Sequence, residues 1–177
     1  GCECCDIVNM MLPLLPGNRW AYEGEGERTE VTVTDRTRVV MGIEAVVVVD
    51  QVFEDGELIE DTEDWFAQDA EGNVWYLGEE TAEYEDGEIV STEGAWEAGV
   101  DGALPGIVMQ ADPQPGQAYR QEYYEDEAED MGEVIGLGET ETVAAGSYED
   151  VVIIREWNPL EPDVVEEPEL PTIEVEV

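Results

Sequence analysis

Three cysteines near the N-terminus, Cys2, Cys4 and Cys5, form the densest group of reactive side chains in this 177-residue chain. Thiolates bind soft metals and also form disulfides. Three cysteines are one short of a four-thiolate metal site, so a metal would need a further ligand or a second subunit. In an exported protein, an odd number of cysteines indicates pairing between chains. We therefore expect disulfides here, including inter-chain ones, with a soft metal as an alternative.

The same cysteines allow two attached groups. The start Gly1-Cys2 is similar to the end of a bacterial lipoprotein cleavage site, although in a mature lipoprotein the cysteine would be the first residue. Cys2 and Cys5 have the C-x-x-C spacing of c-type haem attachment, but Asp6 stands where that motif requires His. A lipid on Cys2, a c-type haem and an unstructured thiol-bearing end therefore stay open beside the disulfides.

A second group of residues offers oxygen ligands. Asp69, Glu71 and Asn73 alternate along the chain with Gly72 between them, as in loops that bind calcium. No acid follows at the position where an EF-hand loop places its bidentate ligand. A bulged hairpin turn explains the same residues without a metal, so calcium is the weaker interpretation.

Catalysis is disfavoured by what the chain lacks. There is no His and no Lys, and six basic residues, all Arg, stand against 47 acidic ones. A Ser-His triad at Ser147 and a Schiff-base lysine are therefore excluded. Carboxylates such as Asp61, Glu63 and Asp64 could form a glycosidase pair, but among 47 acids this pattern does not discriminate, and a solvated strand face is expected. We predict no catalytic residue and no enzymatic activity.

The formal net charge of −41 limits the partners. Phosphates and anionic membrane surfaces would be repelled, which disfavours nucleic acid. Divalent cations, a cationic partner or a high-salt medium would suit this charge. No run of 18 or more apolar residues is present, so no transmembrane helix is expected.

The elements that would carry these groups are β-strands. Apolar and polar residues alternate, as at residues 29–34, and helical periodicity is scarce. Asp55-Gly56 and Asp86-Gly87 are two-residue turn signals between apolar arms, and residues 69–73 make a third turn. From residue 19 to residue 96, turns recur about every ten residues, which predicts an antiparallel meander.

The second half of the chain predicts more strands with one long interruption. Residues 99–118, rich in Gly and Pro, predict a connection with a short apolar plug at 107–109. Residues 125–133 form either a brief helix or an acidic loop. Strands are expected near residues 118–125, 133–137, 139–144 and 151–157.

The last residues alternate strictly. Ile173, Val175 and Val177 are separated by Glu and follow a segment punctuated by prolines, so this strand needs a sheet partner. We divide the chain into a cysteine-bearing N-terminal arm (1–11), a β domain (12–166) and a C-terminal arm that ends in a strand (167–177). The predicted fold class is all-β, a single antiparallel meander that forms a curved half-barrel or a sandwich, with extended N- and C-terminal arms.

The aromatic residues suggest two alternatives. Five tryptophans could line a ligand cavity inside a curved sheet, although at strand spacing such residues are more often core. The residues that we expect to be buried are Val31, Val33, Val47, Trp65, Trp75 and Trp96. The five tryptophans are Trp20, Trp65, Trp75, Trp96 and Trp157.

Residues 12–22, Leu-Pro-Leu-Leu-Pro-Gly-Asn-Arg-Trp-Ala-Tyr, match a P-L-x-x-G-N-x-W-x-Y motif with a residue of variation. Residues 69–78 match D-x-x-G-N-V-W-Y-x-G, and residues 93–99 and 144–151 add shorter stretches. The chain thereby resembles an uncharacterised group of secreted bacterial proteins, sometimes labelled TapB-like, over about residues 12–166. The P-G-[VI]-G-x-V ending of that group is absent from residues 167–177. The resemblance implies export and an antiparallel fold such as the half-barrel of lipoprotein carriers, and it implies no known activity.

Together these features lead to one functional expectation and one alternative. A cysteine-bearing N-terminus can crosslink, and a strand at residues 173–177 can complete a neighbouring sheet. We expect a non-enzymatic subunit of an extracellular or cell-surface filament, whose partner is a second copy of itself. The alternative is a monomeric carrier, secreted or lipid-anchored, that holds an apolar ligand in an aromatic-lined curved sheet.

Overall fold

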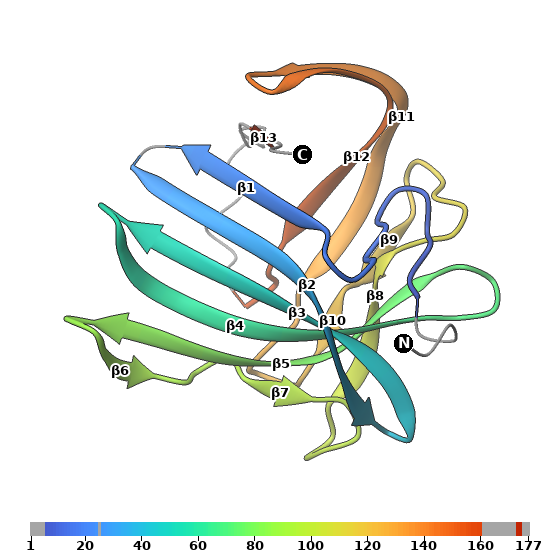
Figure 1. The fold of residues 1–177 in the computed structure, drawn as a ribbon. Coiled ribbons are helices and arrows are strands. Elements are labelled where there is room, and N and C mark those ends of the chain that lie inside the picture. The colour runs from blue at the N-terminus through green and yellow to red at the C-terminus, as the bar shows by residue number, and fades with distance from the viewer. Residues whose placement is uncertain (1–5, 25, 161–172, 175–177) are drawn as a thin grey trace.

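The computed structural model describes residues 6–24, 26–160 and 173–174, and nothing in these ranges is helical. The strands are antiparallel, and the main sheet curls into a half-barrel (Figure 1). The predicted all-β fold class is therefore confirmed, in its half-barrel form and not as a sandwich. No helix in the described part of the chain has the length and hydropathy that crossing a bilayer would require.

Strands β1 to β8 follow one another along the chain with short connections, and longer ones precede β9, β11 and β13. Their bounds are Arg19–Gly24 (β1), Glu27–Val40 (β2), Ile43–Glu54 (β3), Glu57–Gln68 (β4), Val74–Glu85 (β5), Glu88–Ser91 (β6), Trp96–Glu97 (β7), Leu104–Met109 (β8), Ala118–Arg120 (β9), Glu122–Tyr123 (β10), Met131–Val143 (β11), Gly146–Trp157 (β12) and Ile173–Glu174 (β13).

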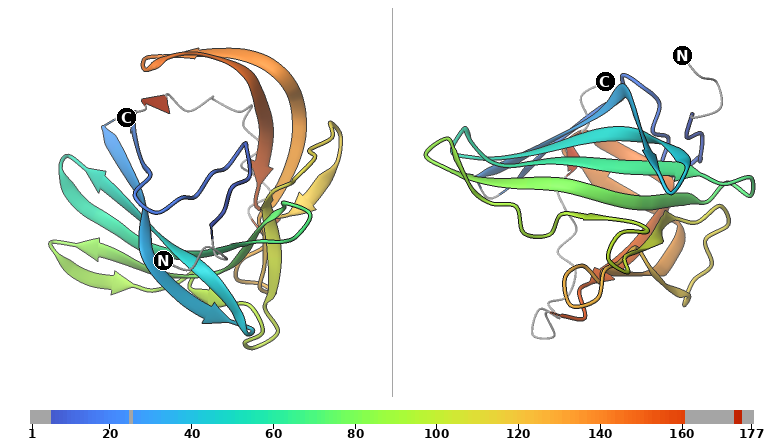
Figure 2. Two further views of the ribbon diagram at one scale, coloured as in Figure 1. Left: turned by 45° about the vertical axis from the view of Figure 1, so that its right-hand side comes forward. Right: turned by 90° about the horizontal axis from the view of Figure 1, so that it is seen from below.

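Two sheets contain these strands. The main sheet has the order β10-β8-β5-β4-β3-β2-β1-β13, with β6 and β7 also pairing with β5. The smaller sheet has the order β12-β11-β9, and its long β11–β12 hairpin arches toward the β1 side of the main sheet (Figures 1 and 2). The neighbouring order of β1 to β5 confirms the meander that the turn spacing predicts.

Two of the turns were predicted from their residues. Asp55-Gly56 joins β3 to β4, and Asp86-Gly87 joins β5 to β6, with positive φ at all four residues. This geometry is a type I′ turn, which matches the right-handed twist of the strands. Met41-Gly42 makes the same turn between β2 and β3, although Met carries no such sequence signal.

Two predictions for the second half are corrected, and one open alternative is decided. Residues 107–109 are not a plug in a loop, because they belong to β8, which pairs with β5 on one side and β10 on the other. The separate strands expected at 133–137 and 139–144 are one strand, β11, with irregular pairing at Ile135 and Gly138. The segment after residue 124 contains a tight turn closed by a Tyr124–Ala128 bridge, so it is a loop and not a helix.

The main sheet packs on both faces. We call the face that carries Val33, Val48 and Asp64 the inner face, since residues 6–18 cross it inside the curve (Figure 2). The opposite, outer face carries Val47 and Trp65. Of the residues predicted to be buried, Val33, Val47, Trp65 and Trp96 are buried, whereas Val31 and Trp75 are only partly buried.

The segment before β1 is part of this packing. Ile7 and Leu14 are buried among Val33, Val46 and Val48 on the inner face. The Asn9 side chain donates to the carbonyls of Gly72 (2.9 Å) and Gln110 (3.3 Å), which ties the segment to the β4–β5 turn and the end of β8. The described part of the predicted N-terminal arm, residues 6–11, is thus packed on the sheet.

Candidate functional site: a carboxyl-lined pocket on the inner face

A pocket of about 520 Å³ lies where the main sheet meets the smaller one. Strands β5, β8, β10 and β12 all contribute to its wall. Its lining residues are Tyr76, Glu79, Val108, Gln121, Glu122, Asp130, Glu156, Trp157 and Asn158. Four of these nine lining residues are acidic and none is basic.

A phenol bridges two carboxyl groups beside this pocket. Asp64 on β4 and Glu79 on β5 are directly opposite each other in the ladder, where two like charges would repel. The buried Tyr76 hydroxyl, which has one proton to donate, lies between them, with its oxygen 2.6 Å from Asp64 Oδ1 and 2.8 Å from Glu79 Oε2. Its ring stacks on Phe66 at 4.9 Å between centroids and meets the Trp96 ring edge-on at 5.4 Å, which fixes the hydroxyl between the two acids.

Glu122 on β10 lies beside Glu79, and we call Asp64, Glu79, Glu122 and Asp130 the carboxyl cluster. Trp96 Nε1–H donates to Glu122 Oε2 at 3.0 Å, and both residues are buried. A hydrogen bond also joins the side chains of Glu122 and Asp130. Trp96 reaches this position because β7 passes close to Gly78, where a Cβ would lie 2.3 Å from the Trp96 carbonyl oxygen. A side chain at position 78 would therefore displace β7.

Burial and mutual repulsion hold protons in this cluster. Desolvation raises the pKa of Asp64 from 3.8 to about 7, against the lowering effect of the Tyr76 hydrogen bond. Desolvation, followed by the charges of Asp130 and Glu79, raises the pKa of Glu122 from 4.5 to about 8. Burial likewise raises the pKa of Glu79, and that of Tyr76 well above its usual value.

The cluster extends along the inner face to Asp50. Desolvation and the neighbouring Glu60 raise the pKa of Asp50 from 3.8 to about 6. Asp50 Oδ1 is shielded from solvent and has no hydrogen-bond partner among the described residues. The charge of Asp50, after desolvation, in turn raises the pKa of Tyr22. The inner face thus carries a row of carboxyl groups that are hard to ionise.

The arginines lie elsewhere. Arg19, Arg28, Arg36 and Arg38 are on β1 and β2, and Arg120 and Arg155 are on β9 and β12. In the described chain, each arginine forms an ion pair, and the partners are Glu23, Glu30, Glu63, Glu80, Glu97, Glu129 and Glu133. None of these partners is Asp50, Asp64, Glu79 or Glu122. These four acids are therefore not neutralised by arginine.

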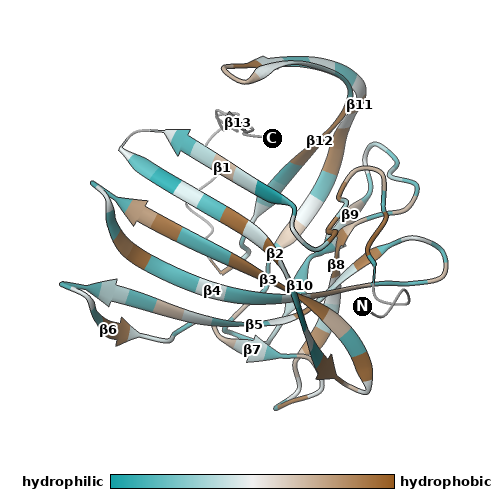
Figure 3. Cartoon of the chain, in the orientation of Figure 1, coloured by the Kyte–Doolittle hydropathy of each residue, from teal (hydrophilic) through white to brown (hydrophobic). Residues whose placement is uncertain are grey.

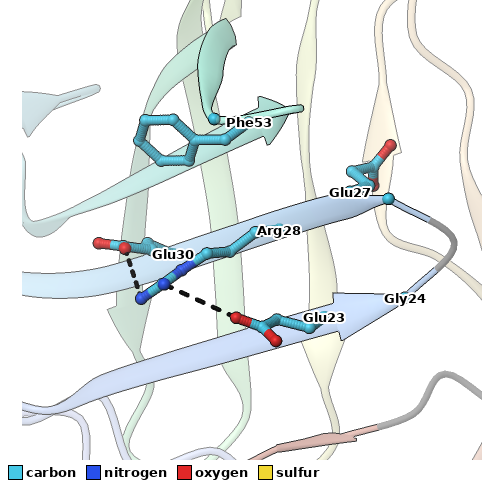
Figure 4. Close-up of a pocket in the computed structure, with 8 residues that line it drawn as sticks. Glu23, Gly24, Glu27, Arg28, Glu30 and Phe53 are labelled. Atoms are coloured by element: carbon cyan, nitrogen blue, oxygen red, sulfur yellow. Dashed lines mark ion pairs between the residues drawn. The ribbon is translucent and has the colours of Figure 1, made fainter.

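A second hollow, of about 640 Å³, lies at the far end of the first strands (Figure 4). Arg28 crosses its floor and pairs with Glu30 at 2.8 Å and Glu23 at 3.6 Å, beside Phe53. These ion pairs are at least partly exposed, and they pair Arg28, the one basic residue among the described residues that line the hollow. The arrangement supports a charged surface groove and no proton-transfer chemistry.

The predicted calcium residues form a hairpin turn. The Asp69 carboxylate accepts hydrogen bonds from Asn73 N and Nδ2 and from Trp75 Nε1, each at 2.8 Å. Desolvation acts against these bonds, but together they hold the pKa of Asp69 below its usual value. The carboxylate is therefore used inside the turn, as the hairpin interpretation predicts. Over the ranges 6–24, 26–160 and 173–174, no group of three or more His, Cys, Asp or Glu residues is arranged to hold a metal.

Most of the other predicted site residues lie outside the described part of the chain. Cys2, Cys4 and Cys5 lie outside the described residues, as do Val175 and Val177. Ile173 is described in its backbone, in β13. The disulfide, metal, haem and lipid interpretations of the cysteines therefore stay predictions.

The sequence did not single out the carboxyl cluster. Asp64 was grouped with Asp61 and Glu63 on a solvated strand face, and this is wrong for Asp64, which lies on the inner face against Tyr76. The tryptophans do not gather around one cavity: Trp65 and Trp96 are core, Trp20 and Trp75 are partly buried beside the two core clusters, and Trp157 lines the pocket.

Comparison with known proteins gives no relative: no protein-family model, no curated protein and no solved structure matches the chain. The resemblance to TapB-like proteins therefore stays a prediction, and the function must be argued from the geometry alone.

Proposed function

We propose that this protein acts by self-association outside the cell, with residues 173–177 of one copy adding a strand to the β1 edge of another. The observation that carries the proposal is the pairing of β13 with β1. Ile173 is in register with Tyr22, and Glu174 with Ala21, in an antiparallel ladder. Within one chain this is the intramolecular closing strand, and it supports β1 as the acceptor edge of the proposed exchange.

The β1 edge faces β13 on its outer side. All six residues of β1 pair with β2 on one side, and among the described residues Ala21 and Tyr22 pair with β13 on the other. Unpaired backbone groups at a sheet edge are a template for a further strand. The alternation of residues 173–177 supplies five residues of strand pattern for that purpose.

The connection to β13 permits exchange between copies. Twelve residues, 161–172, separate the described β domain from β13, and three of them are proline. A strand that leaves its own edge and occupies the same edge of a neighbour remakes the same contacts, so the exchange costs little free energy. Because the donor and acceptor surfaces differ, such contacts propagate head to tail into a ring or an open filament.

The test is removal of residues 168–177 from the full chain. We expect the shortened protein to sediment as a folded monomer, whereas the intact protein assembles as its concentration rises. A synthetic peptide of residues 168–177 should bind the shortened protein, and it should cap assembly of the intact one. Loss of the folded state on truncation, or unchanged assembly, would overturn strand exchange.

The carrier alternative finds less support. An apolar ligand needs a concave apolar wall with few polar groups, whereas the inner pocket is lined by Glu79, Glu122, Asp130 and Glu156. A fluorescent fatty acid that bound the purified monomer stoichiometrically would favour the carrier instead.

A further inference from the structure

We propose that the edge of β12 that faces away from β11 is a second acceptor edge, so that residues 173–177 of one copy enter a slot between β1 and β12 of another. This inference rests on the proposed strand exchange, and it adds the smaller sheet to the interface between copies. The donor strand then forms a ladder on each of its sides, and the half-barrel closes around it.

The strand β12 offers a long edge for such a ladder. It pairs with β11 along most of its length, and no strand in the described part of the chain pairs with its other side. A row of backbone N–H and C=O groups without a ladder is a template for pairing with another chain. Both views show that β12 is the strand of the smaller sheet that lies nearer to β1 (Figures 1 and 2). The two edges therefore border the same opening of the half-barrel.

The residues of this edge are typical of a strand that is covered on both sides. Residues 151–154 are Val-Val-Ile-Ile, all half-buried, and they form a hydrophobic stretch of β12 (Figure 3). Because successive side chains point to opposite faces, the strand is apolar on both faces here. Edge strands that stay unpaired usually carry Lys, Pro or a bulge. Neither Lys nor Pro occurs in residues 151–154, and the irregular pairing at Asp150, with a φ of 60°, precedes them.

The directions of the strands allow one donor to pair with both edges. Neighbouring strands are antiparallel from β1 through the main sheet to β10. Gln121 alone separates β9 from β10, and the amides of Gln121 and Glu122 donate to the Asp130 carbonyl at 2.8 and 3.4 Å, so the curve continues into the smaller sheet. The alternation continues through β9, β11 and β12. β12 thus runs in the same sense as β1, and a strand that is antiparallel to β1, as β13 is, is antiparallel to β12 as well.

The register at β1 suits the side chains of the donor. Continued by two residues, the β13–β1 ladder sets Val175 opposite Trp20 and Glu176 opposite Arg19. Trp20 packs against the core cluster of the inner face, whereas Arg19 is exposed. Pairs of an aromatic with a β-branched residue, and pairs of opposite charge, stabilise a ladder when they are directly opposed. In the exchanged strand the apolar residues therefore face the inside of the curve and the glutamates face outward.

Hydrogen exchange of the full-length chain tests the slot. Substituting Glu174→Pro and Val175→Pro together keeps the length but removes amides from both sides of the donor, since Pro has no N–H and adjacent strand residues direct theirs to opposite edges. At a concentration where the natural protein assembles, we expect residues 19–24 and 151–154 to exchange at least about tenfold more slowly in it than in this double variant. Residues 43–54, in a strand paired on both sides, should exchange equally in both proteins.

The outcomes separate this inference from the proposed function. Slower exchange at residues 19–24 alone would keep the strand exchange at β1 and overturn the slot. Equal exchange of the two proteins at both edges would overturn both proposals. Faster exchange of the variant at residues 43–54 as well would show a loss of its fold, and the comparison of assembly below then decides.

Val152→Lys tests the same edge from the acceptor side. A Lys on an edge strand disfavours addition of a further strand, so we expect the concentration for half-maximal assembly to rise at least about tenfold. Val90→Lys is the matched control, because Val90 lies on β6, which pairs only with β5 in the described residues. This control should assemble like the natural protein. Unchanged assembly of a folded Val152→Lys protein would overturn the slot, and so would an equal loss in Val90→Lys.

Discussion

Two pairs of opposed acids lie one residue apart on the same two strands, and the chain treats them differently. Glu63 and Glu80 face each other on the outer face of β4 and β5, whereas Asp64 and Glu79 face each other on the inner face. On the outer face, Arg36 pairs with Glu63 at 2.7 Å and Arg38 with Glu80 at 3.4 Å. On the inner face no arginine is present, and the Tyr76 hydroxyl bridges the pair.

This difference shows how a chain with six basic and 47 acidic residues distributes its few cations. Four of the six arginines lie on the first two strands, where they pair with exposed and partly buried acids of the outer face. Exposed ion pairs add little stability each. The inner acids cost more free energy to ionise, because they are desolvated. They are stabilised by bound protons and neutral hydrogen-bond donors instead. The outer pair should therefore respond to salt, and the inner pair to pH.

The largest expected effect is the pH dependence of the inner pair. Folded Asp64 and Glu122 keep their protons up to about pH 7 and pH 8, whereas the unfolded chain releases them near 3.8 and 4.5. Between these values the folded state binds more protons, so the free energy of unfolding falls as pH rises. We expect a loss of about 5 kcal/mol between pH 5.5 and pH 8.5, about 2 from Asp64 and about 3 from Glu122, measured by urea unfolding. A free energy of unfolding that stays constant over this pH range would show that the inner acids do not respond to pH differently from the outer ones.

Tyr76→Phe removes the neutral donor and should have the next largest effect. Without the hydroxyl, Asp64 and Glu79 face each other with no hydrogen bond between them. We expect a loss of about 2 to 3 kcal/mol at pH 8, since hydrogen bonds to charged groups are among the strong ones. The loss should shrink at pH 5.5, where one acid can donate to the other. A matched control is Tyr148→Phe, whose exposed ring lies on the β11–β12 hairpin and should leave the stability unchanged.

Asp64→Asn and Glu63→Gln compare the two faces directly. Asn at position 64 keeps an oxygen for Tyr76 but removes a desolvated charge, so we expect a gain of about 1 to 2 kcal/mol at pH 8 and no gain at pH 5. Gln at position 63 removes one exposed ion pair, and we expect a change within about 0.5 kcal/mol at either pH. Equal effects of the two substitutions would show that the faces do not differ.

The sequence was sufficient for the meander but not for the site, and for Asp64 the reason is a single residue. The Asp55-Gly56 turn pairs Glu54 with Glu57 and Phe53 with Leu58, and a regular ladder continued from it would place Asp64 opposite Val47. The bulge at Ile59 shifts the register by one, so Asp64 is opposite Val48, on the other face. A shift by one residue exchanges the two faces of a strand. No sequence pattern in residues 57–60 predicts the bulge.

Other features depend on long-range packing that local patterns do not carry. The strand β8 reads as a Pro- and Gly-rich loop, yet Gly106 permits close approach of β10, since a Cβ there would lie 2.1 Å from the Gln121 carbonyl oxygen. The pKa of Glu122 is raised by burial first and then by the charges of Asp130 and Glu79, which are distant in sequence, against the lowering effect of the Trp96 hydrogen bond. With 47 acids in the chain, no spacing distinguishes these few from the rest. The predicted hairpins, by contrast, depend on two adjacent residues each, and they are confirmed.

The smallest expected effect concerns the outer face and sharpens its salt dependence. Arg38 pairs with Glu97 at 2.6 Å and with Glu80 at 3.4 Å, and its guanidinium carbon lies 3.7 Å from the centroid of the Trp65 ring. Arg38→Gln should lower the free energy of unfolding by about 1 kcal/mol at low salt. In 1 M NaCl the ion pairs are screened but the contact with the ring is shielded by its neighbours, so about half of the loss should persist.

Arg36→Gln, which loses an exposed ion pair without an aromatic contact, is the control, and its smaller loss should vanish in the same salt. A loss at Arg38 that also vanished would show that the outer face is held by screened charges alone, whereas a loss that salt left untouched would assign the whole effect to Trp65.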